Sequence, residues 1–137
     1  MDRLTKLYQK IEEDGIFLFN TSIPNYKAAT LLYENQYGIF VDYARIDSLR
    51  DELSYVAHEY GHCKSGTTHS LLPPLETVSR YEHRANKRAV LEVLPIDDIR
   101  SAISGGCREV WEFCDYLDVS QNFFEKAVYI YREMNLL

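Results

Sequence analysis

The stretch SLRDELSYVAHEYGHCKSG, residues 48–66, predicts one long helix around which the rest of the chain can be placed. Asp47 and Ser48 are both favourable N-caps, and Gly66 can end a helix because glycine tolerates a left-handed backbone. At about 100° per residue, the apolar side chains gather on one side of this helix, which we expect to pack on the core. The side chains of that apolar stripe are Leu49, Leu53, Val56, Ala57 and Tyr60.

Two histidines lie on the side of this helix opposite the apolar stripe. His58 and His62 are four residues apart, so both imidazoles lie on one helix face and can point at one metal ion. Glu59 completes an H-E-x-x-H pattern, in which the glutamate takes a proton from a zinc-bound water without being a ligand. The alternative is a pair of surface histidines, and a third ligand elsewhere would decide between the two interpretations.

Glu82 is the best candidate for that third ligand. It lies on a second predicted helix, roughly residues 76–94, which Pro95 closes. Within the apolar stripe of this helix an unpaired carboxylate would cost several kcal/mol or be forced to stay neutral. Binding of a zinc ion would remove that cost. The stripe consists of Leu75, Val78, Ala85, Ala89 and Val93.

Other assignments stay open at this stage. Ser79 and Glu82 could form a capping box, in which the glutamate only satisfies the start of the helix. His69, in a predicted loop, and His83, on the same helix as Glu82, are rival third ligands. The longer pattern H-E-x-x-H-x-x-G-x-x-H is absent, because Thr68 stands where its third histidine would be.

The remaining chain predicts an α+β fold that is mostly helical, with a small N-terminal β-sheet packed with the H-E-x-x-H helix. Two apolar runs on either side of ENQY (34–37) predict a β-hairpin. We expect residues 1–137 to form a single domain. The expected strands are 16–19, 29–33 and 38–41, and the further helices are about 4–11, 96–104, 107–118 and 120–137.

The composition argues against several classes of function. A net charge of −6 does not suit a protein whose main role is to bind nucleic acid or an anionic membrane. No apolar run is long enough to span a bilayer, and the chain starts with a charged segment rather than a signal peptide. Cys63, Cys107 and Cys114 lack the spacing of a disulfide framework, so we expect a cytoplasmic protein. Cys107 and Cys114 are expected in the core, on one helix.

Two segments resemble the ImmA/IrrE family of metallopeptidases. VAHEYGH (56–62) resembles the H-E-x-x-H helix of that family. YEHRANKRAVLEVLP (81–95) resembles its following helix, where a glutamate opens an E-x-x-A-N-like segment that ends in an apolar-proline step. The residues of this chain in those places are Glu82, Ala85, Asn86, Leu94 and Pro95.

The resemblance extends over most of the chain. YGIFVD (37–42) resembles the strand before the zinc helix of the family, and LDVSQNFFEKAVYIYREMNLL (117–137) resembles its C-terminal helices. It implies an intracellular zinc endopeptidase of the kind encoded by phages and integrative elements. Such an enzyme cleaves a helix-turn-helix repressor and so relieves repression, with no direct contact to nucleic acid or membrane.

The pattern and the resemblance together assign one Zn²⁺ per chain to His58, His62 and Glu82, with Glu59 as the catalytic general base. Asn86, one turn beyond Glu82, could orient a ligand by a hydrogen bond or be an amide on the helix surface, and the two interpretations stay open. The group that stabilises the oxyanion stays open among four residues, which are Tyr55, Tyr60, His69 and His83.

Two alternatives belong to other classes of protein. Residues 110–131 could form a helix-turn-helix interaction module with Val119 and Ser120 in the turn. The second helix of that module would carry a balanced set of charges, which does not favour reading of a DNA groove. A catalytically degenerate protein that binds a repressor without proteolysis is the other alternative. The balanced charges are Glu125, Lys126, Arg132 and Glu133.

Overall fold

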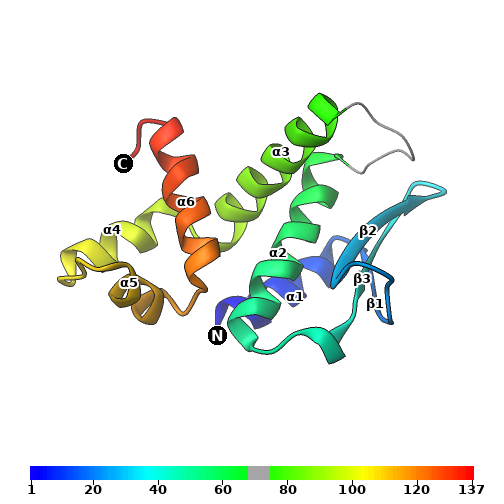
Figure 1. The fold of residues 1–137 in the computed structure, drawn as a ribbon, viewed down its shortest axis with the longest axis horizontal. Coiled ribbons are helices and arrows are strands. Elements are labelled where there is room, and N and C mark those ends of the chain that lie inside the picture. Colours follow the sequence, from blue (N-terminus) through cyan, green and yellow to red (C-terminus); the bar gives the residue numbers. More distant parts are fainter. Residues whose placement is uncertain (68–74) are drawn as a thin grey trace.

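The computed structural model describes residues 1–67 and 75–137. These residues form a three-stranded sheet and a larger helical part, which confirms the predicted mostly helical α+β class. The elements are α1 (Arg3–Glu13), β1 (Phe17–Asn20), β2 (Ala28–Tyr33), β3 (Gln36–Val41), the 3-10 helix η1 (Tyr43–Arg45), α2 (Leu49–Ser65), α3 (Leu75–Val93), α4 (Ile96–Ser104), α5 (Val110–Leu117) and α6 (Gln121–Glu133). The sheet lies at one end of the molecule, and α4, α5 and α6 lie at the other (Figure 1). Among the described residues, no helix has the length and apolar character needed to cross a bilayer.

The sheet has the strand order β1-β3-β2. β3 pairs parallel with β1 and antiparallel with β2, so β2 and β3 form the predicted hairpin. Glu34 and Asn35 make its two-residue turn with φ angles of 49° and 62°, the left-handed conformation that matches the twist of a tight hairpin. The inner face of the sheet packs on α2 and buries Ala28, Ile39 and Val41.

The predicted helix is α2, with Ser48 rather than Asp47 as its N-cap and Gly66 at its end. The Ser48 side chain accepts a hydrogen bond from the Asp51 backbone N–H, and Gly66 adopts a left-handed φ of 68°. The stripe is buried as predicted from Leu53 onward. Leu49 is 72 % exposed, because the surrounding elements cover only the turns beyond the first helical residue.

The backbones of α2 and α3 approach each other closely. A Cβ atom added to Gly61 would lie 2.1 Å from the carbonyl oxygen of Ala85 and 3.2 Å from the backbone nitrogen of Ala89. Ala85 and Ala89 are themselves buried, so the side of α3 that contacts α2 is made of small side chains. Because the separation of two helices is set by the side chains between them, this contact fixes how close the two helices lie (Figure 1).

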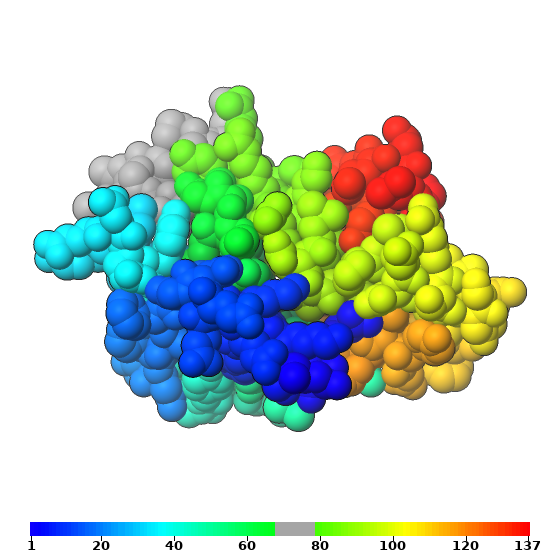
Figure 2. Space-filling view, turned by 180° about the vertical axis from the view of Figure 1, so that it is seen from behind, coloured from blue at the N-terminus to red at the C-terminus, as the bar shows by residue number. Residues whose placement is uncertain are grey.

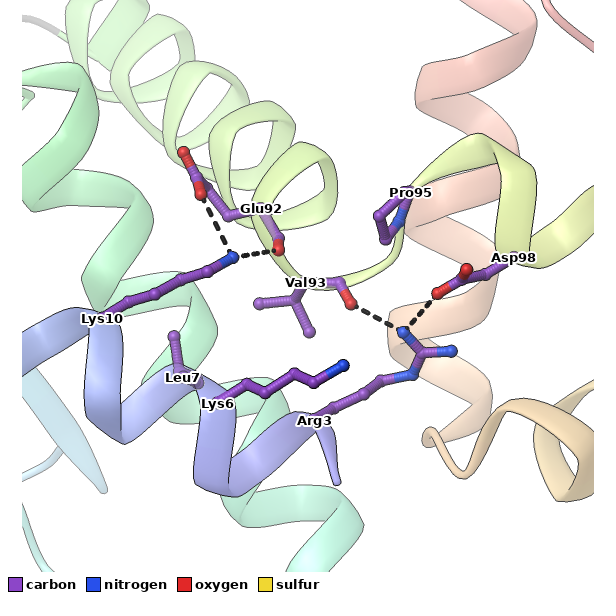
Figure 3. A pocket seen from close by; sticks show the side chains of 8 residues that line it. All are labelled: Arg3, Lys6, Leu7, Lys10, Glu92, Val93, Pro95 and Asp98. Carbon is purple, nitrogen blue, oxygen red and sulfur yellow. Dashed lines mark hydrogen bonds and ion pairs between the residues drawn. The ribbon is translucent and has the colours of Figure 1, made fainter. Parts of the chain in front are cut away.

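Helix α1 ties the sheet side of the molecule to the C-terminal helices. The Arg3 guanidinium donates to the Val93 carbonyl at 3.0 Å and to the Asp98 carboxylate at 2.7 Å, and Lys10 donates to the Glu92 carbonyl at 2.8 Å. These groups line a hollow of about 240 Å³ at the junction of α3 and α4 (Figure 3). From behind, α1 runs across the molecule between the sheet and the C-terminal helices (Figure 2).

The three cysteines are buried free thiols. Cys107 and Cys114 both belong to the hydrophobic core, as predicted. The prediction that they share one helix is wrong, because α5 begins only at Val110. The Glu112 carboxylate accepts a hydrogen bond from the Glu109 backbone N–H, and this capping contact starts the helix after Cys107.

Gly61→Ala should destabilise the protein although alanine is the better helix former. The added Cβ would force α2 and α3 apart, and overpacking of this kind typically costs about 1–3 kcal/mol of unfolding free energy. Chemical denaturation followed by circular dichroism measures the loss. Gly105→Ala is the control and should cost less, since Gly105 has an ordinary φ of −76° and its added Cβ would lie 3.3 Å, rather than 2.1 Å, from the nearest atom. Equal stability of Gly61→Ala and the wild type would contradict the close helix contact.

Candidate metal centre

Three potential metal ligands converge where α2 meets α3. The Nε2 atoms of His58 and His62 lie 3.1 Å apart. The Glu82 carboxylate reaches both rings, with Oε2 2.8 Å from His58 Nε2 and Oε1 3.2 Å from His62 Nε2. The three ligand atoms all lie within 4.8 Å of one another, so this group could hold a metal ion. The structure thus brings together the three residues that the sequence predicted as ligands.

Each imidazole is oriented through its other ring nitrogen. The Oδ1 atom of Asn86 lies 2.8 Å from His58 Nδ1, and the backbone carbonyl oxygen of Thr67 lies 2.8 Å from His62 Nδ1. Both oxygens are acceptors, so each Nδ1 carries the proton and donates it, and each Nε2 presents a lone pair to the centre. Metal-ligating histidines are held in this way, because the outer hydrogen bond fixes both tautomer and ring orientation.

The electrostatics of the cluster favour a bound cation. Two Nε2 lone pairs and a carboxylate at these distances repel one another unless a proton or a metal ion lies between them. Burial lowers the pKa of His58, but the hydrogen bond to Glu82 and the charges of Glu59 and Glu82 together raise that pKa above its usual value. The donor set therefore fits a metal ion in chemistry as well as in position.

Glu82 is more exposed than its position in the sequence predicted. Its side chain is 39 % exposed, against 21 % for His58 and 6 % for His62. Of the predicted α3 stripe, Ala85, Ala89 and Val93 are buried, and the side chains of Leu75 and Val78 lie outside the described residues. The carboxylate therefore lies at the open side of the cluster, and convergence with the two imidazoles, rather than burial, is the evidence for its role as a ligand.

Glu59 lies outside the ligand group, on the side of α2 that faces the sheet. It is 8 % exposed, and its Oε1 atom accepts a hydrogen bond of 2.9 Å from the Thr30 hydroxyl on β2. The same hydroxyl lies 3.2 Å from the Glu59 backbone carbonyl oxygen. Strand β2 thus fixes one carboxylate oxygen of Glu59, which lies between the two candidate histidine ligands in the chain.

Two residues of the centre, Thr30 and Thr67, were missed by the sequence analysis. Thr67 has a local signal, since it directly follows the helix-ending Gly66, whose left-handed turn carries the chain back toward His62. The Thr67 backbone N–H also donates to the His62 carbonyl at 3.1 Å. Thr30 has no such signal, because its contact depends on how β2 packs against α2.

Two of the four candidates for oxyanion stabilisation point away from the centre. Tyr60 is 1 % exposed and its hydroxyl donates to the Asp14 carboxylate. The His83 Nε2 atom lies 3.1 Å from the Glu133 carboxylate of α6. His83 is therefore neither a third ligand nor an oxyanion donor in this arrangement.

The other two candidates have different outcomes. Tyr55 is 36 % exposed on α2, and the Lys27 ammonium lies 5.5 Å from the centroid of its ring. His69 lies outside the described residues, both as a rival ligand and as an oxyanion donor. Asn86, in contrast, accepts a hydrogen bond from His58 Nδ1 and therefore lies next to the ligand group.

Protein purified without chelator should contain about one divalent metal ion per chain, and Glu82→Ala and His62→Ala should lose it. His83→Ala is the matched control, since it removes a histidine of α3 that pairs with Glu133 instead, and it should keep the metal.

Asn86→Ala should weaken metal binding about 10–100-fold through the loss of the His58 hydrogen bond. Affinity should fall as the pH drops through the raised pKa of His58, because protons compete for Nε2. Metal analysis by mass spectrometry checks these outcomes, and full occupancy in Glu82→Ala would reject Glu82 as a ligand.

Comparisons of this chain with models of protein families, with curated proteins and with solved structures give no match. The assignment of the cluster therefore rests on its own geometry. Two imidazoles with fixed tautomers and a carboxylate from a second helix make it a candidate metal centre.

Proposed function

We propose that this protein is a zinc-dependent endopeptidase of the ImmA/IrrE type. One observation carries the proposal: the Nε2 atoms of His58 and His62 and the Glu82 carboxylate converge, with each Nδ1 committed to an outer acceptor. Two histidines and one carboxylate form the ligand set of catalytic zinc sites that keep a fourth position open. Structural zinc sites, in contrast, usually have four protein ligands.

Zinc held by these residues supplies Lewis-acid activation of a water molecule and of the substrate carbonyl. In this proposal Glu59 would accept the proton of that water and return it to the leaving amine. Thr30 holds one oxygen of the Glu59 carboxylate, which limits the rotation of the base. Burial of Glu59 and His62 strengthens their electrostatic interactions, whereas the exposed Glu82 carboxylate leaves one side of the cluster open to solvent.

The proposed substrate is a specific protein, a helix-turn-helix repressor of a phage or another mobile element. The resemblance of residues 56–62 and 81–95 to the ImmA/IrrE motifs supports this choice. The net charge of −6 also suits such a partner, because repressors are usually basic on the face that binds DNA. Selectivity would then come from docking of the repressor rather than from the small metal centre alone.

The helix-turn-helix alternative receives little support from α5 and α6. The aromatic residues Phe123, Phe124 and Tyr131 of α6 are buried in the core. The exposed residues of α6 include Glu125, Arg132 and Glu133, which give the helix no excess of positive charge to face DNA phosphates. A protein that binds a repressor without cutting it remains the alternative that the experiments below distinguish.

Glu59→Gln should separate metal binding from catalysis. Glutamine keeps the size of the side chain and can still accept the Thr30 hydrogen bond, but it cannot accept a proton, so proteolysis should fall about 10²–10⁴-fold with normal metal content. Glu125→Gln, on the exposed side of α6, is the matched control and should keep full activity. Cleavage at the wild-type rate by Glu59→Gln would show that another group is the base.

Co-expression with the repressor encoded beside this gene should remove the full-length repressor, whereas unrelated repressors should survive. Immunoblotting of wild type and Glu59→Gln measures the loss, which should require Glu59. With purified proteins, cleavage should slow as salt is added, because the attraction between opposite charges is screened. An intact repressor with metal bound and Glu59 present would reject the proposed substrate. Relief of repression by Glu59→Gln would instead identify the non-proteolytic alternative.

A further inference from the structure

The outer face of the sheet is apolar apart from Gln36, and no other described element covers it. Helices α1 and α2 pack on the inner face, where Ile39 and Val41 are fully buried, and no described helix lies on the other side (Figure 1). Because side chains alternate along a strand, every second residue of β1, β2 and β3 points outward. We define the outer sheet face as Phe17, Phe19, Ala29, Leu31, Tyr33 and Phe40.

These side chains form one continuous patch. The rings of Phe17 and Phe19 have centroids 6.3 Å apart, and Phe19 stacks on Phe40 at 4.8 Å with an interplanar angle of 18°. The Phe19 and Phe40 rings both lie over Gly38 of β3, since an added Cβ there would be 3.4 Å from each ring. Phe17 and Leu31 both pair with Gly38 in the strand register, so the patch crosses the whole sheet.

The area of the patch matches the apolar part of a dimer interface. Four of its side chains are strongly exposed, and at about 200 Å² for each complete side chain they leave roughly 450 Å² of accessible apolar surface. A standard interface buries about 800 Å² per partner, and homodimer interfaces are about 65 % apolar, which corresponds to roughly 500 Å². The exposed fractions are 58 % for Phe17, 45 % for Phe19, 59 % for Leu31 and 75 % for Tyr33.

The charge of the chain affects which surfaces of two copies can approach each other. None of the six residues of the outer sheet face is charged, whereas the whole chain has a net charge of −6. Two copies of such a chain repel each other over most of their surface, and an uncharged apolar face is where they can approach at least electrostatic cost.

We propose that the outer sheet face is the interface of a symmetric homodimer. The same patch on two copies meets itself across a twofold axis, as in the isologous interfaces of most homodimers. The aromatic rings and Leu31 form the buried centre of the contact. This inference is independent of the proposed peptidase activity, since it uses none of the residues of the metal centre.

Sedimentation velocity of the wild type over a range of concentrations should show a dimer, and Leu31→Glu should weaken its association at least about tenfold by placing a like charge in the centre of the contact. Trp111→Glu is the matched control, because Trp111 is 67 % exposed on α5 and lies away from the sheet. That variant should remain dimeric. Added salt should strengthen the dimer by screening the repulsion between acidic copies. A monomeric wild type at the highest concentration, or a dimer unaffected by Leu31→Glu, would overturn the proposal.

A second measurement does not depend on the folding of Leu31→Glu. Tyr33→Cys places an exposed thiol on the face, and a spin label should attach there selectively because the three native cysteines are buried. Burial also raises the pKa of the Cys63 thiol to about 12, which suppresses its reactive thiolate. Pulsed electron resonance should show one defined distance between two labelled copies. The absence of any coupling between the labels of two copies would reject this interface. A face that is covered by a different protein would give this negative result.

Discussion

The contact between the backbones of α2 and α3 is the constraint on which the metal centre depends. Gly61 lies between His58 and His62 in the H-E-x-x-H turn, and a single added carbon there would collide with the Ala85 carbonyl of α3. At this short separation, Glu82 and Asn86 of α3 reach across to the imidazoles of α2. A bulky residue at the crossing would increase the distance between the helices and separate the carboxylate from the two rings. The small side chains of α3 therefore serve the geometry of the site as well as the packing of the core.

Hydrogen bonds from three parts of the chain orient the two imidazoles of the cluster and the neighbouring Glu59. Asn86 of α3 accepts from His58, and Thr67, just after the end of α2, accepts from His62. Thr30 of β2 donates to Glu59, the proposed base. Each of these partners is a neutral group with an oxygen at hydrogen-bonding distance, so it fixes a side chain without adding charge to the centre. The charge of the centre is left to Glu59 and Glu82, which favour a bound cation.

The sheet serves two roles on its two faces. Its inner face covers α2 and carries the hydroxyl that holds Glu59, so β2 links the sheet directly to the proposed chemistry. Its outer face carries aromatic and aliphatic side chains that the described helices do not cover. The proposed association would use the outer sheet face. It would involve none of the residues of the candidate metal centre, whose open side is marked by the exposed Glu82 carboxylate.

The sequence by itself determined the features that depend on neighbours along the chain. Ser48 and Gly66 located the ends of α2, the ENQY turn located the hairpin, and the four-residue spacing placed His58 and His62 on one helix face, because capping, turns and helical periodicity are local. Only the tertiary structure decided which distant groups meet. It placed the Thr30 hydroxyl on Glu59, turned His83 toward Glu133, and left the Glu82 side chain 39 % exposed where the sequence predicted burial. The physical reason is that such contacts depend on the separation and angle of packed elements. Close contacts such as that of Gly61 with Ala85 set this geometry, and neither segment alone carries a periodic pattern that predicts it.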